Sequence, residues 1–331
     1  MASLSESLAS AWQRRAALLV RLREEGTDSL RVFHGTVEGR AGLTLDRYGS
    51  VLLAQTFREP LTADELDAVR LHAAQLGLPL VWNHRGRERV PGYADELALL
   101  PQVCREHGTA LAFQARHRGQ DPWFFLDLRL GRAVLAREAA HKSFLNLYSY
   151  TAAASLVALQ HGAHTCLTAD FAASALDVAK RHAELNGIDP ARLGCVQEDC
   201  IPIARQLAGL PVKGRGAART YERVLPRRFD IVLLDPPAFS RGPFGAVDVE
   251  RDYPSLAKPA LLALEPGGLL LATNHVAGVS RAQFAATLAR TAEKCGVALQ
   301  SLEIQGADED FPTVDGEGPF KLALVRRAPS V

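Results

Sequence analysis

This sequence has few cysteines, and their spacing indicates neither disulfide pairs nor a metal site. The chain has 331 residues and only five cysteines, an odd number, and no CxxC or Cys/His spacing connects them. They are Cys104, Cys166, Cys195, Cys200 and Cys295. The pattern argues against a disulfide framework and against a structural zinc site. We therefore expect free thiols, a cytoplasmic location and no bound metal.

Long hydrophobic runs are missing as well. No apolar stretch approaches the roughly 20 residues of a membrane-spanning helix. The opening MASLSESLASAWQRRAALL does not have the three-part pattern of a signal peptide. Apolar residues still make up 47% of the chain and charged residues 23%, which is typical of a soluble globular protein with a substantial core. No membrane partner is expected.

Neither sign of charge is in excess, because the formal net charge is +1. A nucleic-acid partner would therefore be held by local basic patches and not by the field of the whole protein. The segment 209–228, GLPVKGRGAARTYERVLPRR, is one such patch, with Glu222 as its single acid. It is either a solvated surface insertion or an arm that gathers phosphates.

The hydrophobic pattern changes character along the chain. Residues 1–29 contain an amphipathic helix, and residues 30–115 alternate short β-like runs with Gly and Asp-Arg-Tyr-Gly turns around one helix. A connector over 116–142 leads into a helix. In 143–331 strand-like and helical segments alternate, which predicts a mainly parallel sheet covered on both faces. The sequence thus predicts an α/β domain preceded by a small α+β domain.

Acidic residues follow three of the predicted strands. Asp170 ends HTCLTAD, Asp199 follows CVQE, and Asp235 ends the buried run of FDIVLLDPPAFSRG, where Pro236 and Pro237 stop the strand. Ligands of open α/β sheets bind beyond the carboxyl ends of the strands. A single acid of this kind is commonly a helix N-cap. Three such acids in consecutive strand–helix units favour a ligand with ribose hydroxyls and an amino group.

The phosphate-binding motifs of nucleotide enzymes are absent. The sequence has no GxxxxGK[ST], and its first strand–helix turn is YSYTAAAS instead of GxGxxG. These absences favour a nucleoside that carries little phosphate over NAD or ATP. S-adenosylmethionine fits this description.

Several segments together resemble a known family. FLNLYSYTAAASLVALQHGA, TADFAASALDVAKRHAELNGID, VQEDC, FDIVLLDPPAFSRG and LEPGGLLLATN resemble, in order and spacing, the motifs of class I S-adenosylmethionine-dependent methyltransferases. With RVFHGTVEGRAGLTLDRYG and WFFLDLRLGR, the chain is similar to the DPPxF large-subunit ribosomal RNA base methyltransferases over about residues 30–325. The resemblance implies a Rossmann-like domain with a mainly parallel seven-stranded sheet, after a small RNA-binding α+β domain.

The resemblance also implies roles for particular residues. Tyr148, Ser149 and Thr151 would line the methionine end of the cofactor, Asp170 would bind its ribose, and Asp199 and Cys200 would flank its adenine. Asp127 and Arg129 would close over the cofactor, and Asp235 would lie beside the transferred methyl. Pro236, Pro237 and Phe239 would shape the slot for a flipped-out base, which stacking on an aromatic ring holds flat.

The target atom depends on a cysteine that this sequence does not have. Cytosine-C5 methylation needs a thiolate that adds to carbon 6, and the cytosine-C5 members carry that cysteine after the GGxLxxxS strand. Here the segment is LLLATNHVAGVS, with Asn274 and His275 as candidates to hydrogen-bond the base edge. The guanine-N7 branch has Ser-Asn-Asn there and a DVxRDH motif that resembles DVERDY. We therefore expect transfer to a ring nitrogen, guanine N7 first.

Other functions stay open. The chain could be a 23S ribosomal RNA cytosine-C5 methyltransferase, a methyltransferase of protein or a small molecule, or a non-catalytic RNA-binding homologue. The last arises because Ala152, Ala153 and Ala154 stand where the family usually has glycines. Weaker cofactor binding, a repositioned methionine tail and simple tolerance are all compatible with these alanines. The oligomeric state, monomer or homodimer, is not decided.

Overall fold

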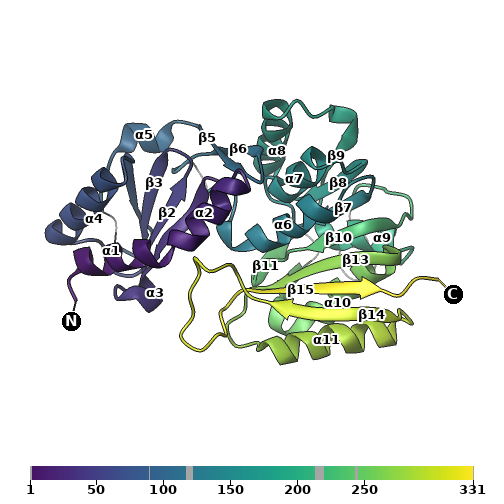
Figure 1. The fold of residues 1–331 in the computed structure, drawn as a ribbon. Coiled ribbons are helices and arrows are strands. Elements are labelled where there is room, and N and C mark those ends of the chain that lie inside the picture. Colours follow the sequence, from purple (N-terminus) through teal and green to yellow (C-terminus); the bar gives the residue numbers. More distant parts are fainter. Residues whose placement is uncertain (1, 89, 117–121, 213–219, 243–244, 331) are drawn as a thin grey trace. The chain divides into compact units, whose positions relative to one another are not determined.

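The chain folds into two compact units. The computed structural model describes residues 2–88, 90–116, 122–212, 220–242 and 245–330. Unit 1 comprises Met1–Arg129 with Asp308–Gly316, and unit 2 comprises Leu130–Ala307 with Glu317–Val331 (Figure 1). The chain therefore leaves unit 1 inside the predicted connector 116–142 and returns to it once near the C-terminus.

Unit 1 is an α+β structure with a four-stranded sheet. The strands β1 (Ser29–His34), β2 (Leu43–Tyr48) and β3 (Val51–Thr56) are antiparallel, and β4 (Leu80–His84) adds parallel to β3. The helices are α1 (Leu4–Arg14), α2 (Ala16–Glu24), α3 (Gly35–Glu38), α4 (Ala63–Gln75) and α5 (Asp95–Leu99). A hairpin of β5 (Gln102–Glu106) and β6 (Thr109–Phe113) and the 3-10 turn η1 (Leu126–Leu128) complete the unit.

The two faces of this sheet differ in polarity. Strand side chains alternate between faces, so Leu43 and Leu45 of β2 pack with α1, α2 and α4 in one hydrophobic core. Asp46 and Tyr48 follow on the other face, and Tyr48 stacks on Phe113 of β6 with ring centroids 4.3 Å apart. The sequence predicts one N-terminal helix over 4–26, whereas the structure has two, separated at Arg15.

A buried ion cluster anchors the segment Asp308–Gly316 within unit 1. The Arg129 guanidinium, 1% exposed, pairs with the carboxylates of Asp308 (3.0 Å) and Asp310. Burial alone would lower the pKa of Arg129, but these carboxylates outweigh it and raise the pKa overall. Arg129 Nη1 also donates to the Ser29 carbonyl (3.2 Å), and the Arg31 amide donates to Asp310 Oδ2 (2.7 Å). The cluster thus ties this segment to β1.

Unit 2 is a seven-stranded sheet of mainly parallel strands. Its order is β14–β15–β13–β10–β7–β8–β9, and only the pairs of β15 with β13 and β14 are antiparallel. These strands are β7 (Ser143–Leu147), β8 (Thr165–Asp170), β9 (Leu193–Gln197), β10 (Phe229–Leu234), β13 (Leu264–Asn274), β14 (Leu299–Gln305) and β15 (Lys321–Arg327). The predicted mainly parallel seven-stranded sheet is confirmed.

Helices cover both faces of this sheet (Figure 1). They are α6 (Arg129–Glu138), α7 (Ala153–Gln160), α8 (Ala173–Leu185), α9 (Cys200–Leu207), α10 (Val249–Leu262) and α11 (Arg281–Lys294). Those on one face, α9, α10 and α11, share a core with Leu145, Leu147, Val232 and Leu234. A one-turn 3-10 helix, η2 (Pro190–Arg192), precedes β9.

The region after β10 differs most from the sequence-based expectation. The sequence predicts a helix over 253–264, but α10 begins at Val249, capped by the Asp248 carboxylate, which accepts from the Glu250 amide (3.0 Å). A hairpin of β11 (Phe239–Gly242) and β12 (Gly245–Asp248) precedes it and was not predicted. In the predicted basic patch 209–228, residues 213–219 lie outside the described residues.

Replacing Asp310 with alanine should destabilise unit 1 strongly. Removing one partner of a buried charge leaves that charge uncompensated, at a cost of about 3 kcal/mol. The neighbouring Glu309 also lies near an arginine, Arg21 at 3.5 Å, but its side chain is 67% exposed. Glu309→Ala should therefore change stability by less than about 0.5 kcal/mol. Urea unfolding of both variants measures the difference, and equal losses would contradict the importance of burial.

Acidification should weaken unit 1 through His34. Burial, together with the Arg31 guanidinium, lowers the pKa of His34 from 6.5 to about 4. Arg31 Nη1 lies 3.1 Å from Nδ1 and can only donate, which requires a neutral acceptor nitrogen. Below pH 6.5, the pKa of His34 in the unfolded chain, the unfolded chain takes up a proton that the folded chain excludes. The free energy of unfolding therefore falls as the pH drops from 6.5 towards 4.

His34→Gln tests this contribution. The variant should lose less stability than the parent protein between about pH 7.5 and about pH 5, since its side chain does not titrate there. Urea midpoints at the two pH values give the comparison. The same loss in both proteins would show that His34 does not contribute.

Candidate functional site

One row of paired residues fixes where the strands of unit 2 end. Leu147 of β7 pairs with Ala169 of β8 and with Leu234 of β10, and Leu234 pairs with Ala272 of β13. The next residue on each strand is therefore the first beyond the row. These residues are Tyr148, Asp170, Asp235 and Thr273, so the predicted acids Asp170 and Asp235 lie along the same edge.

Asp235 is held by two side chains from the end of β13. Thr273 Oγ1 donates to Asp235 Oδ1, and His275 Nε2 lies 3.0 Å from the same oxygen. Asp235 is 23% and His275 31% exposed at the side chain, so the pair borders solvent. The buried hydroxyl of Tyr253 in α10 donates to the Thr273 carbonyl (2.8 Å) and holds the end of β13 in place.

Asn274 occupies a different position from its neighbours. Its side chain is 2% exposed, and its Oδ1 accepts from the Val276 amide at 2.9 Å. Because alternate residues of a strand point to opposite faces, Thr273 and His275 share the side of Asp235 and Asn274 does not. The predicted contact of Asn274 with a base stays a prediction. Strand alternation was the signal in the sequence that could have singled out Thr273.

The proposed base slot follows Asp235 directly. Pro236 is buried and Pro237 exposed, and the Phe239 side chain at the start of β11 is 55% exposed. This exposure suits a ring on which a base could stack. The role of the three residues in shaping such a slot stays a prediction.

The loop after β7 has a strained backbone. Tyr148, Tyr150 and Ala152 have φ values of 60°, 49° and 58°, in the left-handed region that costs a residue with a side chain about 1–2 kcal/mol. Ser149 and Thr151 between them are 8% and 1% exposed. Strain of this kind persists where surrounding contacts determine the conformation, and it clusters at functional sites.

Asp170 stabilises this loop from the end of β8. Its Oδ2 accepts from the Tyr150 amide (2.8 Å) and its Oδ1 from the Ala172 amide (2.9 Å). Burial raises the pKa of Asp170, and these backbone hydrogen bonds oppose the rise. Asp199, 8% exposed, caps α9 by accepting from the Ile201 amide (2.9 Å). The N-cap role considered for such acids thus applies to Asp199, and it does not preclude a ligand.

Cys200 is a buried thiol with two backbone partners. Its Sγ accepts from the Tyr148 amide (3.0 Å) and lies 3.3 Å from the Ala169 carbonyl. Burial raises the pKa of Cys200 well above its ordinary value. A thiol that stays protonated is a poor nucleophile, so Cys200 positions the Tyr148 loop without supplying a thiolate.

Asp127 and Arg129 belong to unit 1, whereas the other predicted site residues belong to unit 2. Asp127 lies in η1 and lines a pocket of unit 1. Arg129 directs its guanidinium to Asp308, Asp310 and the Ser29 carbonyl. The described contacts of Arg129 are structural. The closing of both residues over a cofactor stays a prediction.

The residues at the strand ends fit S-adenosylmethionine. The Ser149 hydroxyl is buried and has no hydrogen-bond partner among the described residues, so a polar ligand group would satisfy it. The Asp170 carboxylate has further lone pairs for the two ribose hydroxyls. Ala152, Ala153 and Ala154 are buried, and Ala152 has a conformation that glycine adopts without strain. Alanine is thus accommodated there at a cost in backbone strain.

Comparison with known proteins identifies the family of the chain. The chain belongs to the S-adenosylmethionine-dependent methyltransferase family, whose model matches residues 30–326. The protein is therefore a methyltransferase, and S-adenosylmethionine is its cofactor.

Individual relatives agree with the family assignment. Ribosomal RNA large subunit methyltransferase I of Aeromonas salmonicida is 27% identical over 318 residues, which cover 93% of this chain and 76% of that protein. The protein of that name from Shigella dysenteriae is 28% identical over 305 residues, covering 88% of this chain and 72% of that protein.

Solved structures share the fold. A Streptococcus mutans structure assigned as an S-adenosylmethionine-dependent methyltransferase has a TM-score of 0.75 at 22% identity and covers 98% of this chain and 82% of its own. The S-adenosylmethionine-dependent methyltransferase from Agrobacterium tumefaciens has a TM-score of 0.63 at 18% identity, with coverage of 92% and 91%. Within the described residues, no helix is long and apolar enough to cross a membrane.

Replacing Asp170 with alanine should weaken cofactor binding. Hydrogen bonds to a charged group contribute about 1.5–3 kcal/mol each, so the Kd for S-adenosylmethionine should rise at least ten-fold. Asp189 offers a matched control, because its exposed carboxylate also accepts a backbone hydrogen bond two residues on, from Ala191 at 2.9 Å. Calorimetric titration of Asp170→Ala and Asp189→Ala should show the loss only in the former. Unchanged affinity in Asp170→Ala would remove Asp170 from the site.

Proposed function

We propose that the protein transfers the methyl group of S-adenosylmethionine to a ring nitrogen of an RNA base, N7 of a guanine in 23S ribosomal RNA first. The observation that carries this proposal is the composition of the edge around Asp235. A carboxylate, an imidazole and a hydroxyl meet there, and the nearby thiol of Cys200 is buried with a raised pKa.

The absence of a usable thiolate favours nitrogen over carbon 5 of cytosine. All five cysteines lie among the described residues. Cys104 is completely buried within unit 1, and burial raises the pKa of Cys166, Cys195, Cys200 and Cys295. A covalent adduct at carbon 6 has no candidate nucleophile at the end of β13, where the segment is Thr273-Asn274-His275.

Transfer to N7 makes modest demands on the protein. The bound cofactor supplies a methyl group on a positively charged sulfur. The N7 lone pair would accept that methyl group with loss of the carbon–sulfur bond, and no proton would leave the base. The residues therefore need only to orient the base in line. Phe239 would stack on it, and the Asp235 carboxylate would stabilise the positive charge that N7 methylation leaves on the ring.

The assignment to RNA rests on the relatives and on unit 1. The two relatives described above are named ribosomal RNA methyltransferases, and they match 93% and 88% of this chain. Their matches are long enough to take in most of both units. A ribosomal RNA substrate is consistent with a chain that has a unit for recognition in addition to the catalytic one.

The modified nucleoside identifies the reaction. The purified protein is incubated with 23S ribosomal RNA transcribed in vitro and with S-adenosylmethionine labelled in the methyl group, and the digested RNA is analysed by mass spectrometry. We expect 7-methylguanosine, because N7 accepts a methyl group without covalent catalysis. Cys200→Ser should keep most of the turnover, since its thiol has only backbone partners in the structure.

Two outcomes would contradict the proposal. Labelled 5-methylcytidine together with loss of turnover in Cys200→Ser would establish the cytosine route. Label in protein or in a small molecule, with none in the RNA, would move the chain to another substrate class.

A further inference from the structure

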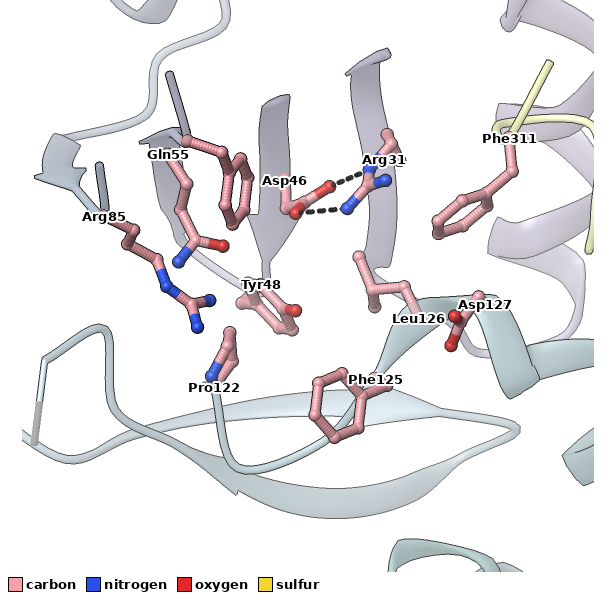
Figure 2. A pocket seen from close by; sticks show the side chains of 11 residues that line it. Arg31, Asp46, Tyr48, Gln55, Arg85, Pro122, Phe125, Leu126, Asp127 and Phe311 are labelled. Atoms are coloured by element: carbon pink, nitrogen blue, oxygen red, sulfur yellow. Dashed lines mark hydrogen bonds and ion pairs between the residues drawn. The ribbon is translucent and has the colours of Figure 1, made fainter. Parts of the chain in front are cut away.

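Unit 1 contains a pocket lined entirely by its own residues, among them Asp127. It has a volume of about 230 Å³ and lies on the polar face of the four-stranded sheet, between strand residues, the 122–127 segment and Phe311 (Figure 2). Pockets for drug-sized ligands measure about 300–1,000 Å³. This one is smaller and suits a single ring system.

Aromatic rings line the pocket without filling it. Phe57 and Phe125 are each 44% exposed, which is unusual for phenylalanine on a folded unit. The Phe311 ring also lines the pocket, and the Arg31 guanidinium lies over it, 4.4 Å from its centroid. Exposed aromatic faces around a small cavity are the surfaces on which unpaired bases stack.

A buried amide on the pocket wall needs a hydrogen-bond acceptor. Gln55 of β3 is 4% exposed, and its Nε2 has no hydrogen-bond partner among the described residues. In Figure 2 this amide points into the space beside Tyr48 and Arg85. A buried donor without an acceptor costs free energy, and a carbonyl oxygen or ring nitrogen of a base would satisfy it.

The charges around the pocket balance. Arg31 pairs with Asp46 through Nε (2.8 Å) and Nη2 (3.1 Å), as Figure 2 shows, and Arg85 and Asp127 add one charge of each sign. Two arginines against two aspartates leave no net charge to capture a phosphate or another anion. A neutral ligand with hydrogen-bonding edges fits better. The Arg85 guanidinium also lies 5.2 Å from the centroid of the Phe57 ring.

We propose that this pocket binds one unpaired base of the RNA substrate, distinct from the base that is methylated. The base stacks on Phe57 or Phe125, and a carbonyl oxygen or ring nitrogen on its edge accepts from Gln55 Nε2. Unit 1 thereby recognises a single-stranded element of the RNA. This inference rests on the proposed RNA substrate and adds a second point of recognition to it.

Binding of short RNAs to point variants tests the pocket. The probes are fluorescein-labelled 12-nucleotide strands of uridine, of cytidine, of adenosine and of alternating guanosine and uridine, with a 12-base-pair RNA duplex for comparison. Gln55→Leu removes the donor at nearly constant volume, and Phe125→Leu removes a stacking face. Each should weaken binding of the preferred single strand by about ten-fold, the size of one lost hydrogen bond for Gln55→Leu and of one lost stacking contact for Phe125→Leu, and leave duplex binding unchanged.

Controls separate recognition from folding. Gln75→Leu makes the same substitution on the exposed side of α4 and should bind every probe as the parent protein does. S-adenosylmethionine affinity should be the same in all variants, and Phe57→Leu replaces Phe125→Leu if the latter does not fold.

The outcomes distinguish this inference from the proposed function. Parent-like single-strand binding by Gln55→Leu and by the phenylalanine variant would overturn the pocket while leaving the RNA substrate in place. A loss of cofactor affinity in Gln55→Leu would assign the pocket to the cofactor instead. No binding of any RNA by the parent protein would overturn the pocket and the RNA substrate together.

Discussion

The site of this protein depends on the hydrogen-bonded row Ala169–Leu147–Leu234–Ala272 across four strands. All four residues are almost completely buried, so the row is part of the core and its register cannot slip without turning side chains to the wrong face. The first residue beyond the row on each strand belongs to the candidate site. The packing of these apolar residues, which carry no reactive groups, therefore sets the relative positions of the Tyr148 loop, Asp170, Asp235 and Thr273.

The sequence predicted much of this edge because strand ends are marked by residue type. An apolar run followed by an acid indicates both the strand and its carboxyl end, as at Asp170, and the two prolines after Asp235 leave little freedom in where that strand stops. The sequence also assigned the α/β class, since its strands and helices alternate. These features are local, and local patterns survive in a single sequence.

Contacts between distant segments were not predictable in the same way. Nothing adjacent to Asp235 indicates that Thr273 and His275 will meet its carboxylate 38 and 40 residues later. Arg129 lies in a motif whose resemblance implies a cofactor contact, yet its described partners are Asp308 and Asp310, about 180 residues away. The hairpin of β11 and β12 was missed because each of its strands has only four residues, which is too short for a periodic apolar pattern.

Several arginines of unit 1 are held in buried ion pairs. Arg15 and Glu38 form a pair in which each side chain is at most 3% exposed, and Arg129 is equally buried against its two aspartates. Arg31 forms an ion pair with Asp46. Cations placed in such pairs are not available to attract phosphates, since their charge is already compensated at short range. The RNA recognition proposed for unit 1 therefore rests on stacking and hydrogen bonds, for which the pocket lined by Gln55, Phe57 and Phe125 is suited.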